Sequence, residues 1–130
     1  MCGAVVFQNG ESWSRGLPVV RMDVDKISRV LDNLVDNALR HTPAGGRVLL
    51  GAEIHTSGVR FTVGDTGPGV AAADLAHIFE RFYRGDGARG RGGSGLGLAI
   101  ARSLVELHGG TIGADSVPGA GTTIYFNLPL

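Results

Sequence analysis

Two asparagines, Asn33 and Asn37, stand four residues apart in a segment whose apolar residues recur at helical spacing. Residues at this separation share one face of a helix, and Arg40 and His41 continue that face by one turn. Asparagine is a mediocre helix former. Its side-chain carbonyl can however ligate Mg²⁺, and an arginine can contact phosphate oxygens. The face is therefore a candidate metal and phosphate site, and a solvated helix face is the alternative.

A carboxylate and two glycines form a second cluster, Asp65-Thr66-Gly67-Pro68-Gly69, directly after a predicted strand. A carboxylate at the end of a strand can accept a hydrogen bond from an exocyclic amine such as adenine N6. Gly67 and Gly69 allow the backbone to approach a flat ring closely. The cluster is a candidate base-binding turn, and an ordinary Asp-Thr-Gly turn is the alternative.

Glycine supplies 22 of the 130 residues, and its distribution is uneven. One stretch holds seven of them: Gly85, Gly87, Gly90, Gly92, Gly93, Gly95 and Gly97. Successive glycines free backbone N–H groups to wrap phosphates, and a helix N-terminus favours negative charge. Because an apolar helix is predicted from Leu96 to His108, a phosphate-binding loop is favoured over a flexible surface loop.

Three familiar motifs are disfavoured. Gly90 to Gly95 satisfies the spacing G-x-G-x-x-G, but a dinucleotide-binding fold needs a strand directly before it, and here a polar loop precedes it. A P-loop needs a lysine after its glycines, and the only lysine is Lys26. The run from Arg84 to Arg91 is similar to RNA-binding Arg-Gly segments, but it has only three arginines and its aromatic neighbours lie at one end.

The elements that must position these clusters follow from periodicity and turn signals. Asp23 is expected to cap a helix from about Val24 to His41, and a short helix is expected from Ala71 to Phe79. The predicted strands are Ala4–Gln8, Pro18–Met22, Arg47–His55, Val59–Gly64, Thr111–Asp115 and Thr122–Leu128. This order predicts an α+β domain over residues 1–130, with hairpin-joined strands on one sheet and the helices on one face.

Composition narrows the class of protein further. Hydrophobic residues make up 43%, which is enough for a core, and 12 basic residues balance 12 acidic ones. The balance argues against a nucleic acid or an anionic membrane held by bulk electrostatics. Cys2 alone cannot form an internal disulfide, so a reducing compartment is expected. No apolar run approaches a membrane span and no signal peptide is visible, so this fragment is expected to be soluble.

Taken in order, the clusters resemble the four sequence boxes of the ATP-binding domain of bacterial sensor histidine kinases, in the GHKL ATPase superfamily. Residues 33–43 are similar to the asparagine box and residues 65–69 to the first glycine box. Residues 78–84 are similar to the phenylalanine box and residues 93–100 to the second glycine box. The match extends from about Pro18 to the C-terminus and implies a two-layer α/β sandwich, a mixed sheet of about five strands under about three helices.

The resemblance assigns five residues to the end of an ATP site that holds the adenine base. Asp65 would bind adenine N6, Gly67 and Gly69 would shape the pocket, and Thr122 would lie near the adenine. His41 stands where many relatives have a tyrosine beside the adenine, so weaker or pH-sensitive packing is expected.

The resemblance also assigns the phosphate end. Asn37 would ligate Mg²⁺, Asn33 would support the phosphate side, and Arg40 would contact phosphates. The lid, about residues 81–95, and the helix start after it would close over the phosphates, with Gly93, Gly95, Leu96 and Gly97 as the binding residues. The loop lacks the lysine of some members, which leaves Arg84, Arg89 and Arg91 as candidates.

The expected activity is phosphoryl transfer rather than hydrolysis. Superfamily members that hydrolyse ATP carry a glutamate base four residues before the Mg²⁺ asparagine, and Asn33 occupies that position here. None of the histidines matches the family's phosphoacceptor, because His41, His55, His77 and His108 are each followed by a residue that is not acidic. The acceptor is therefore expected on a separate dimerisation domain, with little activity by this chain alone.

The resemblance implies a response regulator downstream and a cytoplasmic position in a parent kinase anchored in the inner membrane. Two other functions stay open. An anti-sigma-type serine kinase shares the fold and the boxes, and a nucleotide-binding module without transfer activity would act through shape alone.

Overall fold

The computed structural model describes residues 23–55, 58–82 and 96–129. In chain order the elements are α1 (Val24–His41), β1 (Val48–His55), β2 (Gly58–Asp65), α2 (Ala72–Leu75), α3 (Gly97–Leu107), β3 (Thr111–Val117) and β4 (Gly121–Pro129). None of the helices in these ranges is long and apolar enough to cross a membrane.

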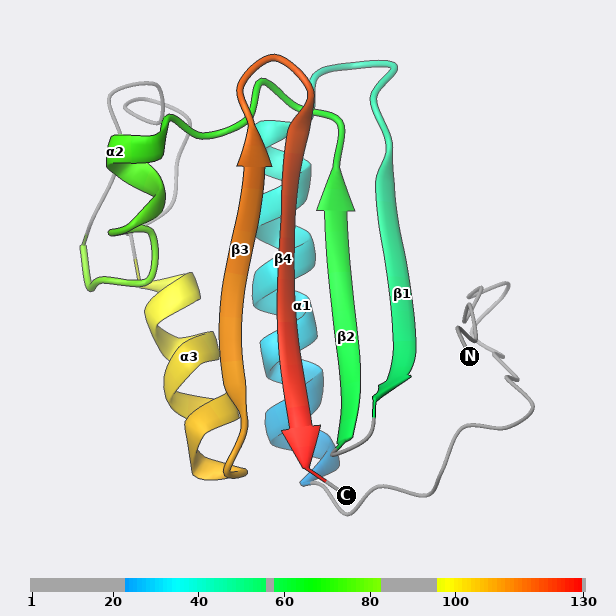
Figure 1. The fold of residues 1–130 in the computed structure, drawn as a ribbon, viewed down its shortest axis with the longest axis vertical. Coiled ribbons are helices and arrows are strands. Elements are labelled where there is room, and N and C mark those ends of the chain that lie inside the picture. Colours follow the sequence, from blue (N-terminus) through cyan, green and yellow to red (C-terminus); the bar gives the residue numbers. More distant parts are fainter. Residues whose placement is uncertain (1–22, 56–57, 83–95, 130) are drawn as a thin grey trace.

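One antiparallel sheet organises the described residues, with strand order β1-β2-β4-β3. Helices α1 and α3 lie side by side against one face of it, and α2 lies beside β3 (Figure 1). The predicted α+β fold with its helices on one face is confirmed. The resemblance implied a mixed sheet of about five strands, but all pairs among the four described strands are antiparallel. The further strands expected at 4–8 and 18–22 lie outside the described residues.

The core lies between the sheet and the two long helices. Alternation along β4 turns Ile124, Phe126 and Leu128 inward, each no more than 3% exposed. The Phe126 ring stacks on Phe61 of β2 with ring centroids 4.9 Å apart. From α1, the buried residues Ile27, Val30, Leu34 and Ala38 meet this layer. Burial of these apolar faces fixes the register in which the strands pair. The residues at the ends of the strands are therefore held at set positions as well.

Helix α1 has the bounds that its sequence predicts. Asp23 is extended and its Oδ1 accepts the Lys26 N–H at 3.2 Å, as an N-cap does. The helix ends at His41, and Thr42 is again extended, as expected for a residue before Pro43. Helix α2 is shorter than predicted, Ala72–Leu75 instead of Ala71–Phe79. It gives way to tight turns in which His77 N–H donates to Asp74 O and Glu80 N–H donates to His77 O, both at 2.9 Å.

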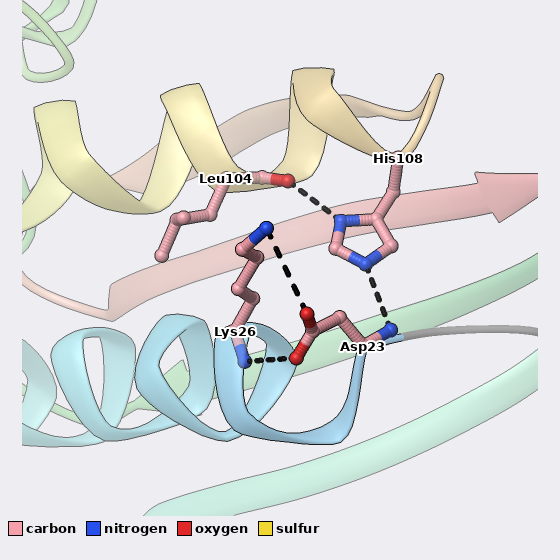
Figure 2. Close-up of polar contacts among 4 residues, drawn as sticks. All are labelled: Asp23, Lys26, Leu104 and His108. Carbon is pink, nitrogen blue, oxygen red and sulfur yellow. Dashed lines mark hydrogen bonds and ion pairs between the residues drawn. The ribbon is translucent and has the colours of Figure 1, made fainter.

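A histidine joins the start of α1 to the end of α3 (Figure 2). The Asp23 N–H donates to His108 Nε2 at 3.0 Å, and His108 Nδ1 lies 2.8 Å from the carbonyl oxygen of Leu104. A carbonyl only accepts, so Nδ1 carries the proton and Nε2 is the acceptor. The two helices therefore run antiparallel and are fastened at this end.

The cap predicts how stability depends on pH. The Lys26 N–H holds the pKa of the Asp23 carboxyl below its ordinary value of 3.8, and the nearby charge of Lys26 acts in the same direction. A carboxyl with a lowered folded-state pKa contributes stability above its unfolded pKa, and that contribution is lost as pH falls through the folded pKa. Asp23→Asn keeps a capping side chain without this titration.

The free energy of unfolding of the native chain and of Asp23→Asn should therefore differ most above pH 3.8 and converge below it. Urea titrations from about pH 5 downward would measure the difference. A difference that stays constant over this range would contradict the role given to the Asp23 charge.

Candidate functional site

Three polar residues form a row across the helix-facing side of the sheet. Asp65 at the end of β2 is the cross-strand partner of Thr122 on β4, and Thr122 is in turn the partner of Ser116 on β3. Cross-strand partners share a face, so the three side chains are neighbours at the end of the sheet that carries the β3–β4 turn (Figure 1). Thr122 is buried at 8% exposure, and Asp65 and Ser116 are half-buried. A polar row at the rim of an apolar core marks a candidate binding site.

The loop after β2 crosses the same end of the molecule. The Gly67 N–H donates to Asp65 Oδ1 at 2.9 Å, and the Gly119 N–H in the β3–β4 turn donates to the Pro68 carbonyl at 2.7 Å. Within the described residues, the other Asp65 oxygen accepts no hydrogen bond. One carboxylate oxygen thus holds the turn, and the second is available to a ligand.

Two glycines let this loop pass close to its neighbours. A Cβ on Gly67 would lie 2.3 Å from the His41 carbonyl oxygen at the end of α1. Gly69 has φ +78°, and a Cβ there would lie 2.5 Å from the Val117 carbonyl oxygen. The loop therefore packs closely between the end of α1 and the β3–β4 turn, which explains why positions 67 and 69 carry glycine.

The asparagine face of α1 turns toward the start of α3. A Cβ on Gly97 would lie 3.9 Å from Asn33 Oδ1, and both Asn33 and Asn37 are half-buried. Asn33 Nδ2 is buried and has no hydrogen-bond partner within the described residues. The first turn of α3 adds N–H groups that no helical carbonyl reaches, and Leu96 supplies no side-chain cap. Unused donors on two adjacent helices suit an anion.

The backbone carbonyl and the side-chain amide of Asn37 have different surroundings. Its backbone carbonyl accepts the His41 Nδ1–H at 2.7 Å, while its side-chain amide bonds to no described residue. Its amide oxygen is a hard ligand of the type that Mg²⁺ prefers. Within the described ranges no group of three His, Cys, Asp or Glu side chains is arranged to hold a metal. The donor set fits an ion held jointly by Asn37 and by phosphate oxygens of a ligand.

A chain of contacts thus connects most of the residues predicted for the site. It runs from Thr122 and Asp65 through Gly67 to His41 and Asn37, and then along α1 to Asn33 and Gly97. Arg40 lies outside it, because its guanidinium pairs with Asp36 on the exposed side of α1. Arg84, Gly93 and Gly95, with most of the expected lid, lie outside the described residues.

Ser116 belongs to the candidate site by its contacts and was not predicted from the sequence. Its Oγ accepts the Val70 N–H at 2.6 Å and lies 2.9 Å from Thr122 Oγ1. Alternation along β3 turns Ile112, Ala114 and Ser116 to one face, and this period-2 pattern was the signal that could have placed Ser116 beside the core.

The family model of histidine kinase-, DNA gyrase B- and HSP90-like ATPases matches residues 22–130. The sensor histidine kinase WalK of Bacillus subtilis (strain 168) is 48% identical over 114 residues, which are 85% of this chain and 19% of WalK. The chain therefore spans about one fifth of that relative's length.

Two solved structures show the same fold. A mycobacterial sensor histidine kinase, MprB, superposes with a TM-score of 0.78 at 35% identity, over 91% of this chain and 78% of that one. Full-length ShkA in complex with AMPPNP gives a TM-score of 0.77 at 41% identity, over 87% of this chain and 23% of that one.

Proposed function

The chain belongs to the family of histidine kinase-, DNA gyrase B- and HSP90-like ATPases, and from this we propose that it binds ATP with Mg²⁺ and donates the γ-phosphoryl group to a histidine on a separate dimerisation domain. The observation that carries the proposal is the chain of contacts from Thr122 and Asp65 to Asn33 and Gly97. These contacts place a carboxylate that can accept from a base amine, Asp65, in one series with groups that can donate to an anion, at Asn33 and at the start of α3. The relatives named as sensor histidine kinases support the same activity.

The base end would bind adenine through Asp65. Because Oδ1 already accepts the Gly67 N–H, the second carboxylate oxygen would accept from the N6 amine. Gly67 and Gly69 would shape the base pocket, because they let this loop pack closely against the His41 and Val117 carbonyl oxygens. The His41 ring, held by its Nδ1–H on the Asn37 carbonyl, would lie at the border between base and phosphates.

The phosphate end would use the asparagine face of α1. Asn33 Nδ2 lacks a partner in the described structure, so a phosphate oxygen would satisfy a buried donor that otherwise costs free energy. Asn37 would ligate Mg²⁺, which when bound would neutralise charge on the transferring phosphoryl group. The N–H groups at the start of α3, near Gly97, would add favourable charge for the phosphates.

Transfer is favoured over hydrolysis by the side chain at position 33. A carboxamide cannot take a proton from water. The neighbouring carboxylates Asp32 and Asp36 are exposed, whereas Asn33 is half-buried, and Asp36 pairs with Arg40. We also propose a response regulator as the final acceptor and a membrane-anchored parent with this domain in the cytoplasm. The serine-kinase and transfer-inactive alternatives remain outcomes of the experiment below.

Calorimetric titration with ATP, with and without Mg²⁺, tests the binding step. Labelled ATP is then incubated with the chain and an isolated histidine-bearing dimerisation domain. We expect Mg²⁺-dependent binding, slow hydrolysis and an acid-labile phosphohistidine on the partner. Binding without transfer to any histidine partner would support the transfer-inactive module, and an acid-stable phosphoserine would support the serine kinase. No binding by the folded chain would overturn the proposal.

Arg40 provides a prediction of its own. Its ion pair with Asp36 is exposed, with 41% and 59% of the two side chains accessible, so either alanine substitution should change stability by at most about 0.5 kcal/mol. If the guanidinium turns to phosphate, Arg40→Ala should weaken ATP binding roughly two- to fivefold. Asp36→Ala frees Arg40 and should leave affinity equal or higher. Thermal unfolding and calorimetry measure both effects, and equal losses of affinity in the two variants would contradict a phosphate contact.

A further inference from the structure

Ser116 makes three hydrogen bonds at the base end of the site. The Val70 N–H, from the loop that follows Gly69, donates to Ser116 Oγ at 2.6 Å. The Ser116 hydroxyl lies 3.1 Å from the Gly121 carbonyl oxygen and 2.9 Å from Thr122 Oγ1. A half-buried serine therefore ties the loop to both residues that begin β4.

The direction of each bond follows from the number of protons. A serine hydroxyl has one proton and two lone pairs. The Gly121 carbonyl can only accept, so the Ser116 proton points to it. The Val70 N–H can only donate, which uses one lone pair of Ser116. The contact with Thr122 must then use the second lone pair, and the Thr122 hydroxyl is the donor.

This assignment fixes what Thr122 offers to a ligand. With its proton committed to Ser116, the Thr122 oxygen has only lone pairs to present. Its cross-strand partner Asp65 also presents an oxygen without a proton. The two residues form an acceptor-only edge, which suits an amino group and opposes a carbonyl.

We infer that Ser116 is a positioning residue that holds the Thr122 hydroxyl as an acceptor beside Asp65, so that the site selects a base with an amino group over one with a carbonyl. The inference rests on the proposed binding of ATP. Ser116 itself contacts no ligand and acts only through the Thr122 hydroxyl.

The test compares ATP with inosine triphosphate, which carries a carbonyl in place of the N6 amine. Competition against a fluorescent ATP analogue in the presence of Mg²⁺ gives both affinities, and their ratio is the readout. We expect Ser116→Ala to reduce the preference for ATP roughly tenfold, about the value of one hydrogen bond, because the freed Thr122 proton can now donate to the carbonyl. Ser116→Thr keeps a hydroxyl and should keep the preference. Ser103→Ala, at an exposed serine of α3, is the matched control.

A double-mutant cycle separates this role from a merely structural one. Thr122→Val removes the hydroxyl through which Ser116 acts, so adding Ser116→Ala to it should change the ratio no further. Additive effects, or equal loss of both affinities in Ser116→Ala, would overturn the inference. If the native chain binds neither nucleotide, the proposed function fails instead. If Ser116→Ala does not fold, Ser116→Thr provides the test through its ratio of affinities for ATP and inosine triphosphate. This variant retains a hydroxyl at position 116, so a loss of the preference for ATP would contradict the role given to that hydroxyl.

Discussion

Asp65→Asn is expected to weaken ATP binding roughly 10- to 150-fold while leaving the fold intact, which corresponds to about 1.5–3 kcal/mol for a hydrogen bond to a charged group. The asparagine Oδ1 can still accept the Gly67 N–H, so the turn after β2 keeps its bond. Its Nδ2 then stands where the second carboxylate oxygen stood. A donor would face the donor of adenine N6, and the interaction would change sign.

Asp115→Asn is the matched control for this variant. Asp115 lies on β3, one residue before Ser116, and is exposed on the opposite face of the sheet. Calorimetric titration should show native affinity for Asp115→Asn, with similar thermal unfolding for both variants. If Asp65→Asn binds ATP as well as the native chain does, Asp65 is only a turn residue and the base end of the site is elsewhere.

Gly67→Ala should both destabilise the chain and remove most ATP binding. An added Cβ would lie 2.3 Å from the His41 carbonyl oxygen and 3.0 Å from Asp65 Oδ1. Backbone cannot turn aside as a side chain can, so the loop must move away from α1, and overpacking of this kind costs about 1–3 kcal/mol. The movement would also displace the carboxylate that the Gly67 N–H positions.

Gly64→Ala is the control for Gly67→Ala. Gly64 lies on β2 directly before Asp65, and an added Cβ there would come no closer than 3.3 Å, to the side-chain oxygen of Thr123. Urea unfolding and ATP titration of the two variants would distinguish the effect of a methyl group added to the loop from that of a methyl group added to the strand. Native affinity in Gly67→Ala would show that the ligand does not depend on the close approach of this loop to α1.

Local signals predicted the elements well where the sequence has clear starts and stops. Asp23 and Pro43 flank a regular apolar period, and α1 was therefore predicted from Val24 to His41 as observed. Turn residues likewise separated β1 from β2 and β3 from β4, although the ends of the strands differ by one or two residues. The short helix α2 was overestimated, because no periodicity distinguishes a helix from consecutive tight turns over so few residues.

The site needed more than local signals. Asp65 and Thr122 are brought together by strand register, which depends on how β2 and β4 bury their apolar faces. Their association was predicted only through the resemblance to histidine kinases. Ser116 carries no chemistry of its own in a sequence motif, and its importance appears only when its three partners are seen in space. The roles of the residues in the contact chain remain predictions.

The bond between Asp23 and His108 has a mechanical consequence. Asp23 is the first described residue, and it lies where α1 begins and α3 ends (Figure 2). A pull or twist applied there loads both helices at once instead of fraying the first turn of α1 alone. Those helices also carry Asn33 and Gly97, which face each other farther along the same antiparallel pair. The hydrogen bonds of His108 therefore couple the two helices at one end of the pair, and the candidate phosphate site lies farther along the same pair.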